Sequence, residues 1–296
     1  MTVWREVLVW AIFAAIVASP AFGQNAASAT QPDFSGVWRH PSWPGFEPLP
    51  SGPTSLINLA GNKGRNGLIF LVGDYTNPIL KPHAAEIVKR RGEKSLAGGF
   101  PTPSTQCTPG GVPYILASFG MQMLQQPQQV TLIYDHPLIE FRKVRMNEPH
   151  ASPLRPSWYG DSVGHYEGDT LVIDTMGVRV GPFSMADLLG TPFTPALHVV
   201  ERYRMLDYEA AKEGLDRDAK WNIRFPGYVD PNYRGKHLQL TFTVDDEGAF
   251  TMPWSATVNY GRGPPKPPTT DWEDHVCAEN PSRYYGPPPT ADKPDF

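Results

Sequence analysis

Alternation of apolar and polar residues is the clearest pattern along this chain. It is most regular over Leu238–Val244, where leucine, phenylalanine and valine alternate with glutamine and threonine. A period of two places successive side chains on opposite faces of an extended strand. This stretch therefore predicts a β-strand with one buried face.

The same alternation, or a short β-prone run between turn residues, predicts the other strands. The most distinctive is a hairpin in which Trp158–Glu167 and Thr170–Thr175 are the strands and Glu167-Gly168-Asp169 is the tight reversal. Pro253 inside the last strand favours a sheet edge or a bulge. The remaining predicted strands span residues 33–39, 68–72, 120–125, 129–135, 138–146, 195–205 and 249–259.

Helical patterns are scarce. Lys81-Pro82 introduces one predicted helix, His83–Arg91, with proline near its first turn and basic residues near its last. Residues 92–113 read as a loop, and residues 206–236 mix a short charged helix-like piece with turns. About nine or ten strands with one or two short helices predict an all-β fold, an antiparallel barrel or sandwich with long loops. A barrel of this size can hold one small ligand inside.

The beginning of the chain predicts a cleaved signal peptide, and the remaining residues predict one domain with a tail. Arg5 precedes an apolar core, Val7–Val17, and small residues lie just before Gln24, so residues 1–23 read as a cleaved signal peptide. An uncleaved membrane anchor is the alternative, but the apolar run is short for a bilayer. Residues 24–32 are a flexible leader, 33–260 one β domain, and 261–296 a proline-rich tail packed on it. We therefore expect a periplasmic or secreted protein without a stable membrane span.

Composition limits the classes of partner and the cellular compartment that we expect for this protein. The 296 residues carry a net charge of −4 and no long basic run, so nucleic acid is not an expected partner. Two cysteines, Cys107 and Cys277, can form one disulfide in an oxidising compartment, or remain as two buried thiols. Neither lies in a zinc-binding spacing, and nucleotide-binding motifs are absent, so no metal and no cofactor are expected.

The first strand of the hairpin carries the densest chemistry. In an extended strand Tyr159, Asp161, His165 and Glu167 share one face, and Asp161 and His165 stand ~13 Å apart, too far to hydrogen-bond unless a bulge intervenes. We predict His165 as an acid or base, with Asp161 as its partner or a second acid–base group. The alternative is that both lie on a solvated face.

Other segments supply possible ligand contacts. Arg142, if it points into a barrel, can anchor a substrate anion; the alternative is a surface ion pair. His150 lies in a loop that can face the same opening. His150 and Glu167 are residue types that can bind a metal ion, but the spacing of the histidines is not that of a metal site. The aromatic residues predicted to line a ligand pocket are Trp158, Tyr159, Tyr166 and Trp254.

Several motifs resemble a large, mostly uncharacterised family of exported bacterial proteins. They are Asp33-Phe34-Ser35-Gly36-Val37-Trp38, the loop at Cys107 to Gly110, Glu167 to Thr175, Leu197 to Tyr203, Met252-Pro253-Trp254, and Glu273 to Asn280. Both cysteines fall in these motifs, which supports the disulfide. This chain has Asp161, His165 and Tyr166 where the family pattern has histidine, arginine and tryptophan.

The Gly36-Val37-Trp38 start also resembles the first strand of lipocalin and calycin barrels. In those folds the tryptophan closes one end of the barrel and often packs beneath an arginine. The resemblance implies a lipocalin-like barrel, a fold class that includes cofactor-free phenolic acid decarboxylases.

These observations together predict an exported, cofactor-independent lyase or isomerase. Its reaction would be an acid–base elimination or decarboxylation on a small apolar, aromatic or phenolic compound bound in the barrel. One alternative is a non-catalytic periplasmic lipocalin-like binding protein for a hydrophobic small molecule. A structural envelope protein is a third class, and the oligomeric state is left open.

Overall fold

The computed structural model describes residues 31–40, 42–43, 46–61, 70–135, 139–224 and 227–264. Strands predominate in these ranges, with two α-helices and two short 3-10 helices. The elements are β1 (Gly36–Arg39), β2 (Ser42–Trp43), β3 (Glu47–Pro48), α1 (Pro82–Ala97), η2 (Ser104–Gln106), η3 (Tyr114–Ala117), β4 (Gly120–Gln125), β5 (Gln129–Asp135), β6 (Ile139–Met146), β7 (Asp161–Glu167), β8 (Thr170–Met176), β9 (His198–Leu206), α2 (Tyr208–Trp221), β10 (Ile223–Arg224), β11 (His237–Asp245) and β12 (Trp254–Tyr260).

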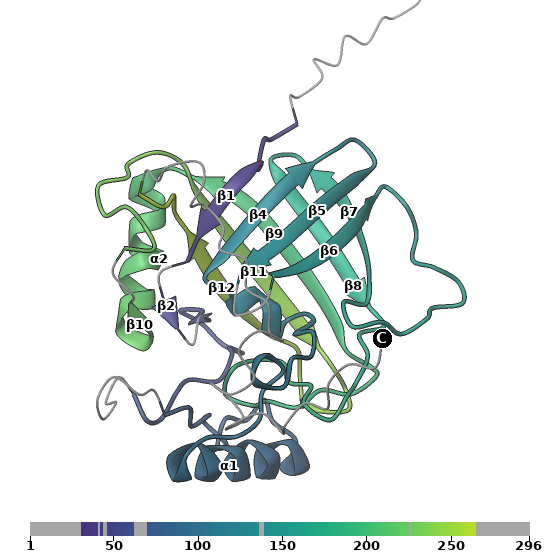
Figure 1. Cartoon of the computed structure of the whole chain (residues 1–296), viewed down its shortest axis with the longest axis vertical. Helices are drawn as coiled ribbons and strands as arrows, with labels where there is room; N and C mark the ends of the chain where they lie inside the picture. Colours follow the sequence, from purple (N-terminus) through teal and green to yellow (C-terminus); the bar gives the residue numbers. More distant parts are fainter. Residues whose placement is uncertain are drawn as a thin grey trace, which may run out of the picture. The chain divides into compact units, whose positions relative to one another are not determined.

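The predicted all-β, barrel-like fold is confirmed. Ten strands form one curled sheet in the order β1-β4-β5-β6-β7-β8-β9-β11-β12-β3, and β10 pairs with β2 in a separate two-stranded piece (Figure 1). Every neighbouring pair in the large sheet is antiparallel except β6 and β7, which run parallel. The long loop between those two strands, residues 147–160, allows the chain to return to the same end of the sheet before β7 begins.

A single β-bridge joins β1 to the residue that follows β12, near the other end of the large sheet. Arg39, at the end of β1, exchanges two backbone hydrogen bonds of 2.9 Å with Gly261, just beyond β12. β3 pairs with the earlier part of β12 through Pro48 and Glu47. Segments from the start of the domain therefore cover the outer edge of β12, and the sheet curls into a barrel-like form.

The concave side of the sheet is the core of the domain. Strand pairing places one alternate set of side chains on this side, and burying each large apolar member contributes roughly 1.5–3 kcal/mol. The members with at most 1% of their surface exposed include Trp38, Met121, Leu132, Val144, Leu171, Ile173, Val199, Leu240, Phe242 and Val258. The guanidinium of Arg262 stacks 3.5 Å from the ring centroid of Trp38, the arginine contact that the resemblance to lipocalins implies.

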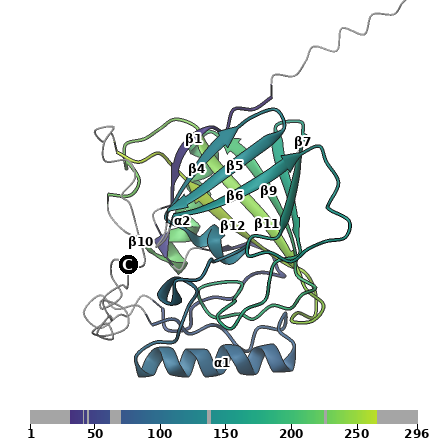
Figure 2. The same ribbon diagram turned by 45° about the vertical axis from the view of Figure 1, so that its right-hand side comes forward.

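Both ends of the barrel are covered. Phe34 is fully buried beside β1, where its N–H bonds to the side chain of Gln125. At the other end η3 packs inward, and the hydroxyl of Tyr260 donates to the carbonyl of Leu116. Coil segments and α1 lie beyond that end, as Figure 2 shows.

Most strand predictions agree with the structure, but β1 begins at Gly36 and β12 at Trp254, so Pro253 precedes the last strand instead of lying inside it; the helices are longer than predicted. The turn at Gly168 has the positive φ that its prediction requires. The first strand of that hairpin begins at Asp161 rather than Trp158, because Gly160 adopts a positive φ in a turn before it. α1 runs on to Ala97 through part of the predicted loop, and Gly92 within it packs closely against Val72.

One further strand prediction is wrong, and the predictions for the two ends of the chain concern residues outside the described ranges. The strand predicted over residues 68–72 is not present in its described part, residues 70–72, which are irregular. The predicted signal peptide, most of the leader, Cys277 and the tail from residue 265 lie outside the described residues. Among the helices of the described ranges, none has the length and apolar character needed to cross a membrane.

Candidate functional site

The centre of the barrel holds an ion pair between β6 and β9. Arg142 and Glu201 are 1% and 0% exposed, and both lie on the concave side of the sheet. Arg142 Nη2 donates to Glu201 Oε2 at 2.9 Å and lies 2.8 Å from Oε1. Tyr203 donates its hydroxyl to the same Oε2 at 2.8 Å. The interior cluster, as we call Tyr134, Arg142, Glu201 and Tyr203, is therefore a charged group enclosed in an apolar core.

Part of the interior cluster has unused hydrogen-bonding capacity. Arg142 Nε and Nη1 have no hydrogen-bond partner among the described residues, and neither has the hydroxyl of Tyr134, although the Tyr203 hydroxyl lies near it. Glu201 Oε1 contacts Arg142 Nη2 but outside hydrogen-bond geometry. Leaving a buried polar group unpaired costs about 1–3 kcal/mol, so such groups in native proteins usually face water, a ligand or a functional partner.

Burial sets the protonation of the interior cluster. Burial by itself lowers the pKa of Arg142, but the adjacent Glu201 carboxylate outweighs it, so the guanidinium pKa is raised. Burial raises the pKa of both Tyr134 and Tyr203. The cluster thus offers a fixed cation and two hydroxyls that keep their protons, grouped around one carboxylate.

A second carboxyl faces the interior from β6. Glu140 Oε2 accepts hydrogen bonds from the Gly110 N–H at 2.8 Å and from the Tyr159 hydroxyl at 2.9 Å. Burial raises the pKa of Glu140, and these two donors only partly offset that effect. This contact joins the loop after Cys107 and the β6–β7 loop to one end of the barrel.

The catalytic residues predicted on β7 lie on the other side of the sheet. Ser162 and Thr175 oppose each other on the buried face of the hairpin, so the alternate residues Asp161 and His165 face outward. His165 is half-exposed, and its Nε2 lies 3.0 Å from Glu167 Oε1. Asp161 and His165 form no hydrogen bond with each other, in agreement with the extended-strand distance.

Asp161 belongs instead to a group of side chains on the outer face of β6–β9. We call Arg145, His150, Asp161, Asp174 and His198 the outer cluster. Arg145 Nη2 lies 2.8 and 3.0 Å from the two Asp161 oxygens, and the Ala151 N–H donates to Asp161 Oδ2. Partial burial favours a raised pKa for Asp161, but these hydrogen bonds outweigh it and the pKa is lowered.

Histidines complete the outer cluster. His150 Nδ1 lies 3.0 Å from Asp161 Oδ2, and His150 Nε2 lies 3.0 Å from Asp174 Oδ1. His198 Nε2 lies 2.8 Å from the same Asp174 oxygen. Sequence reasoning singled out His150 and Asp161 but missed Asp174 and His198, because only strand pairing brings β8 and β9 to the loop that carries His150.

The predicted pocket residues do not meet in one place. Arg142 points into the barrel as its predicted role requires, and Trp254 is buried there against Phe242 and Phe250. Tyr166 accepts a hydrogen bond from Gln125 near the Phe34 end, while Tyr159 binds Glu140 at the opposite end. Trp158 is part-exposed in the β6–β7 loop, with Arg179 over its ring.

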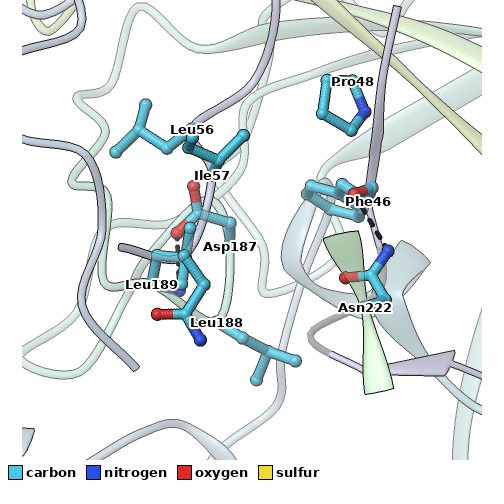
Figure 3. Close-up of a pocket in the computed structure, with 9 residues that line it drawn as sticks. Phe46, Pro48, Leu56, Ile57, Asp187, Leu188, Leu189 and Asn222 are labelled. Atoms are coloured by element: carbon cyan, nitrogen blue, oxygen red, sulfur yellow. Dashed lines mark hydrogen bonds between the residues drawn. The ribbon is translucent and has the colours of Figure 1, made fainter. Parts of the chain in front are cut away.

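A small pocket lies away from both clusters (Figure 3). Its cavity volume is only about 20 Å³, so it is a hollow of about water size. The Asp187 carboxylate at its wall is already bonded to Thr191 and to the Leu189 N–H, so this acid is occupied in holding its own loop. The lining residues are Phe46, Pro48, Leu56, Ile57, Asn58, Asp187, Leu188, Leu189 and Asn222.

A further buried carboxyl lies where β3 meets α2. Glu47 Oε1 accepts from Arg217 Nε at 2.5 Å, and Oε2 accepts from Asn259 Nδ2 at 2.5 Å. Burial raises the pKa of Glu47 to about 7, against the opposing effect of Arg217. Glu213 contacts the same arginine from the exposed side of α2.

The raised pKa of Glu47 predicts a pH-dependent stability. The folded protein holds the proton more tightly than the unfolded chain, so the free energy of unfolding should fall as pH rises from about 4.5 to 7. Glu47→Gln removes this titration. As pH rises from 4.5 to 7, the free energy of unfolding of Glu47→Gln, measured relative to that of the natural chain, should increase by on the order of 2–3 kcal/mol. Thermal unfolding of both proteins between pH 4.5 and 8 measures the difference, with Glu213→Gln as control. Parallel curves for Glu47→Gln and the natural chain would contradict the prediction.

Comparison of the chain with protein-family models, with curated proteins and with solved structures found no match.

Proposed function

We propose that this protein is a cofactor-independent lyase or isomerase that carries out acid–base chemistry on a small aromatic compound inside the barrel. The observation that carries the proposal is the buried Arg142–Glu201 pair, whose guanidinium has two nitrogens, Nε and Nη1, without a partner among the described residues. A bound anionic group satisfies these donors, and the surrounding tyrosine and phenylalanine rings suit a flat, apolar ligand.

The interior cluster can divide the chemistry among its members. Glu201 accepts a proton from a substrate carbon, while Arg142 holds the negative charge that develops on a neighbouring oxygen. In an isomerisation the proton returns to a different carbon. In an elimination the leaving group takes a proton from Tyr203 as the new double bond forms, and Glu201 passes the proton that it accepted from carbon back to Tyr203 through their hydrogen bond. In a decarboxylation the bond from carbon to the carboxylate breaks, CO₂ leaves, and the same carbon takes up a proton that solvent supplies through Glu201.

This proposal moves the acid–base roles away from β7. His165 and Asp161 lie on the outer face, so they do not reach a ligand held on the concave side. Of the residues that the sequence analysis put forward for catalysis, Arg142 keeps its role as anion anchor. Glu201 and Tyr203 take the roles of base and acid.

The second candidate function is a non-catalytic binding protein. It is favoured by the enclosure of the interior cluster, since Phe34 and Leu116 are fully buried at the two ends of the barrel. A binding protein would hold the same ligand class without converting it. Both candidates include export to the periplasm or the medium, which fractionation of the native host would test.

Tyr134→Phe tests whether the interior is a ligand site. The lost hydroxyl has no hydrogen-bond partner among the described residues, so the free energy of unfolding should change by less than about 1 kcal/mol. If the hydroxyl contacts a ligand, affinity should fall roughly 5- to 10-fold, the effect of one lost hydrogen bond. Tryptophan fluorescence during titration with single-ring aromatic acids and phenols reports binding, and the absorbance of the same compounds reports turnover.

Tyr75→Phe is the matched control, because Tyr75 is an exposed tyrosine on the protein surface. Binding with equal affinity to Tyr134→Phe and the natural chain would count against the interior as the site. Binding without any conversion would favour the non-catalytic alternative. If no compound of this class binds, both functions fail.

A further inference from the structure

The outer cluster contains donor atoms of a metal site. Asp174 Oδ1 lies 3.0 Å from His150 Nε2 and 2.8 Å from His198 Nε2. Ligands bound to a tetrahedral zinc ion at ~2.0–2.1 Å stand about 3.3 Å from one another. The two nitrogen–oxygen separations are therefore within about half an ångström of that spacing. Two imidazoles and one carboxylate are also a donor set that zinc uses when it keeps a fourth position open.

The remaining members of the outer cluster resemble the support that metal-binding histidines receive. A ligating histidine usually donates its second ring N–H to a carboxylate, which fixes the orientation of the ring. His150 Nδ1 lies 3.0 Å from Asp161 Oδ2. Asp161 is in turn held by Arg145 and by the Ala151 N–H, so this support is anchored on β6 and on the start of the loop.

The charges of this region also favour a cation. The carboxylates of Glu148 and Asp161 pair with the guanidinium of Arg145, and the carboxylate of Asp174 contacts both imidazoles, so this region holds three carboxylates and one guanidinium. Both nitrogens of His150 face carboxylate oxygens, Nδ1 that of Asp161 and Nε2 that of Asp174. A divalent ion between Nε2 and Asp174 adds positive charge beside these carboxylates and leaves the Asp161 contact intact.

We propose that His150, Asp174 and His198 bind one divalent transition-metal ion of the zinc type, with Asp161 and Arg145 as positioning residues. Within the described ranges, no three such side chains already surround a common position that could hold a metal. Binding therefore requires the two imidazoles to turn toward each other, so that both Nε2 atoms and an Asp174 oxygen face one ion. The three side chains are a quarter to a third exposed, which leaves room for that movement and for water at the fourth position.

Zinc binding to the full chain tests the proposal. The protein is prepared without an affinity tag, treated with EDTA, and titrated with ZnCl₂ by calorimetry at pH 7.5. We expect one ion per chain with a Kd of micromolar or below, and a rise in Tm that Mg²⁺ at the same concentration does not produce. Asp174→Asn and His198→Gln should each weaken binding at least tenfold. Asp161→Asn should weaken binding while the ion stays bound to the same three ligands.

His165→Gln is the matched control. His165 is another exposed imidazole beside a carboxylate on the same face, and it should not affect zinc affinity. The visible absorption of bound Co²⁺ gives a second readout, which should change when His150 or His198 is replaced and stay the same in His165→Gln. Thermal unfolding in EDTA verifies that each variant is folded. The proposal is overturned if the natural chain binds zinc no more tightly than His198→Gln, or if the Co²⁺ spectrum is unaffected by both histidine replacements.

Discussion

Arg142→Met should lower the free energy of unfolding by about 3–5 kcal/mol, because it leaves Glu201 as an unpaired charge in the barrel interior. Glu201 is fully buried, and its remaining hydrogen bond comes from the hydroxyl of Tyr203. One hydroxyl does not replace a guanidinium as a source of charge stabilisation. Urea denaturation at neutral pH measures the loss.

Removing the whole polar group should reverse most of that effect. Arg142→Met combined with Glu201→Leu and Tyr203→Phe leaves no charge and no unpaired hydroxyl at these three positions, and buried ion pairs replaced by apolar residues are often neutral or stabilising. Arg145→Met is the control. It lies on the same strand but forms part-exposed ion pairs, which typically contribute about 0–1 kcal/mol.

The combined variant also separates stability from function. If it folds as stably as the natural chain and has lost ligand binding, the polar residues are present for the ligand rather than for the fold. An Arg142→Met protein as stable as the natural chain would show that Glu201 can become neutral or reach solvent. In that case the argument for a charged interior site fails.

Reduction of a Cys107–Cys277 disulfide should lower the free energy of unfolding by about 4–5 kcal/mol, since the bond would close a loop of well over a hundred residues. For a domain of this size that corresponds to a fall in Tm of roughly 10–20 °C. Cys107 lies directly after η2, in the segment that leads to the Gly110 contact with Glu140. Loss of the bond would therefore loosen one end of the barrel as well.

Thiol titration of the unfolded, unreduced protein tests the bond first. No free thiol is expected, and two free thiols would show that the cysteines are not paired with each other. Thermal unfolding with and without reductant then measures the effect, with Cys107→Ser/Cys277→Ser as a variant that reductant should not change.

The alternation of apolar and polar residues predicts the strands well, but it does not predict which side chains of other strands each residue contacts. β4, β5 and β11 match the alternation almost to the residue, because one face of each is buried and its period is visible. The pairing of Arg142 with Glu201 depends on the sheet order from β6 to β9, which no short stretch of sequence contains. The same holds for the contacts of His150 and His198 with Asp174.

The sequence of β7 does not indicate which of its two faces is buried. Ser162 and Gly164 face the core, and neither residue is typical of a buried strand face. Gly164 is needed because Val144 and Met146 pack where a side chain would stand. Asp161 and His165 on the other face attracted the functional prediction, although the barrel interior is on the side of the small residues.

The junction of Arg39 with Gly261 has a consequence for how the chain folds. These two residues are roughly two hundred positions apart, and their hydrogen bonds join the first strand to the last. Contacts of such long sequence separation form slowly, because loop-closure entropy must be overcome before they stabilise anything. Until the final strand is available, β1 presents an open backbone edge, to which other chains can add. Completion of the barrel is thus a late event in folding, and the segment around Gly261 governs when the sheet stops being prone to association.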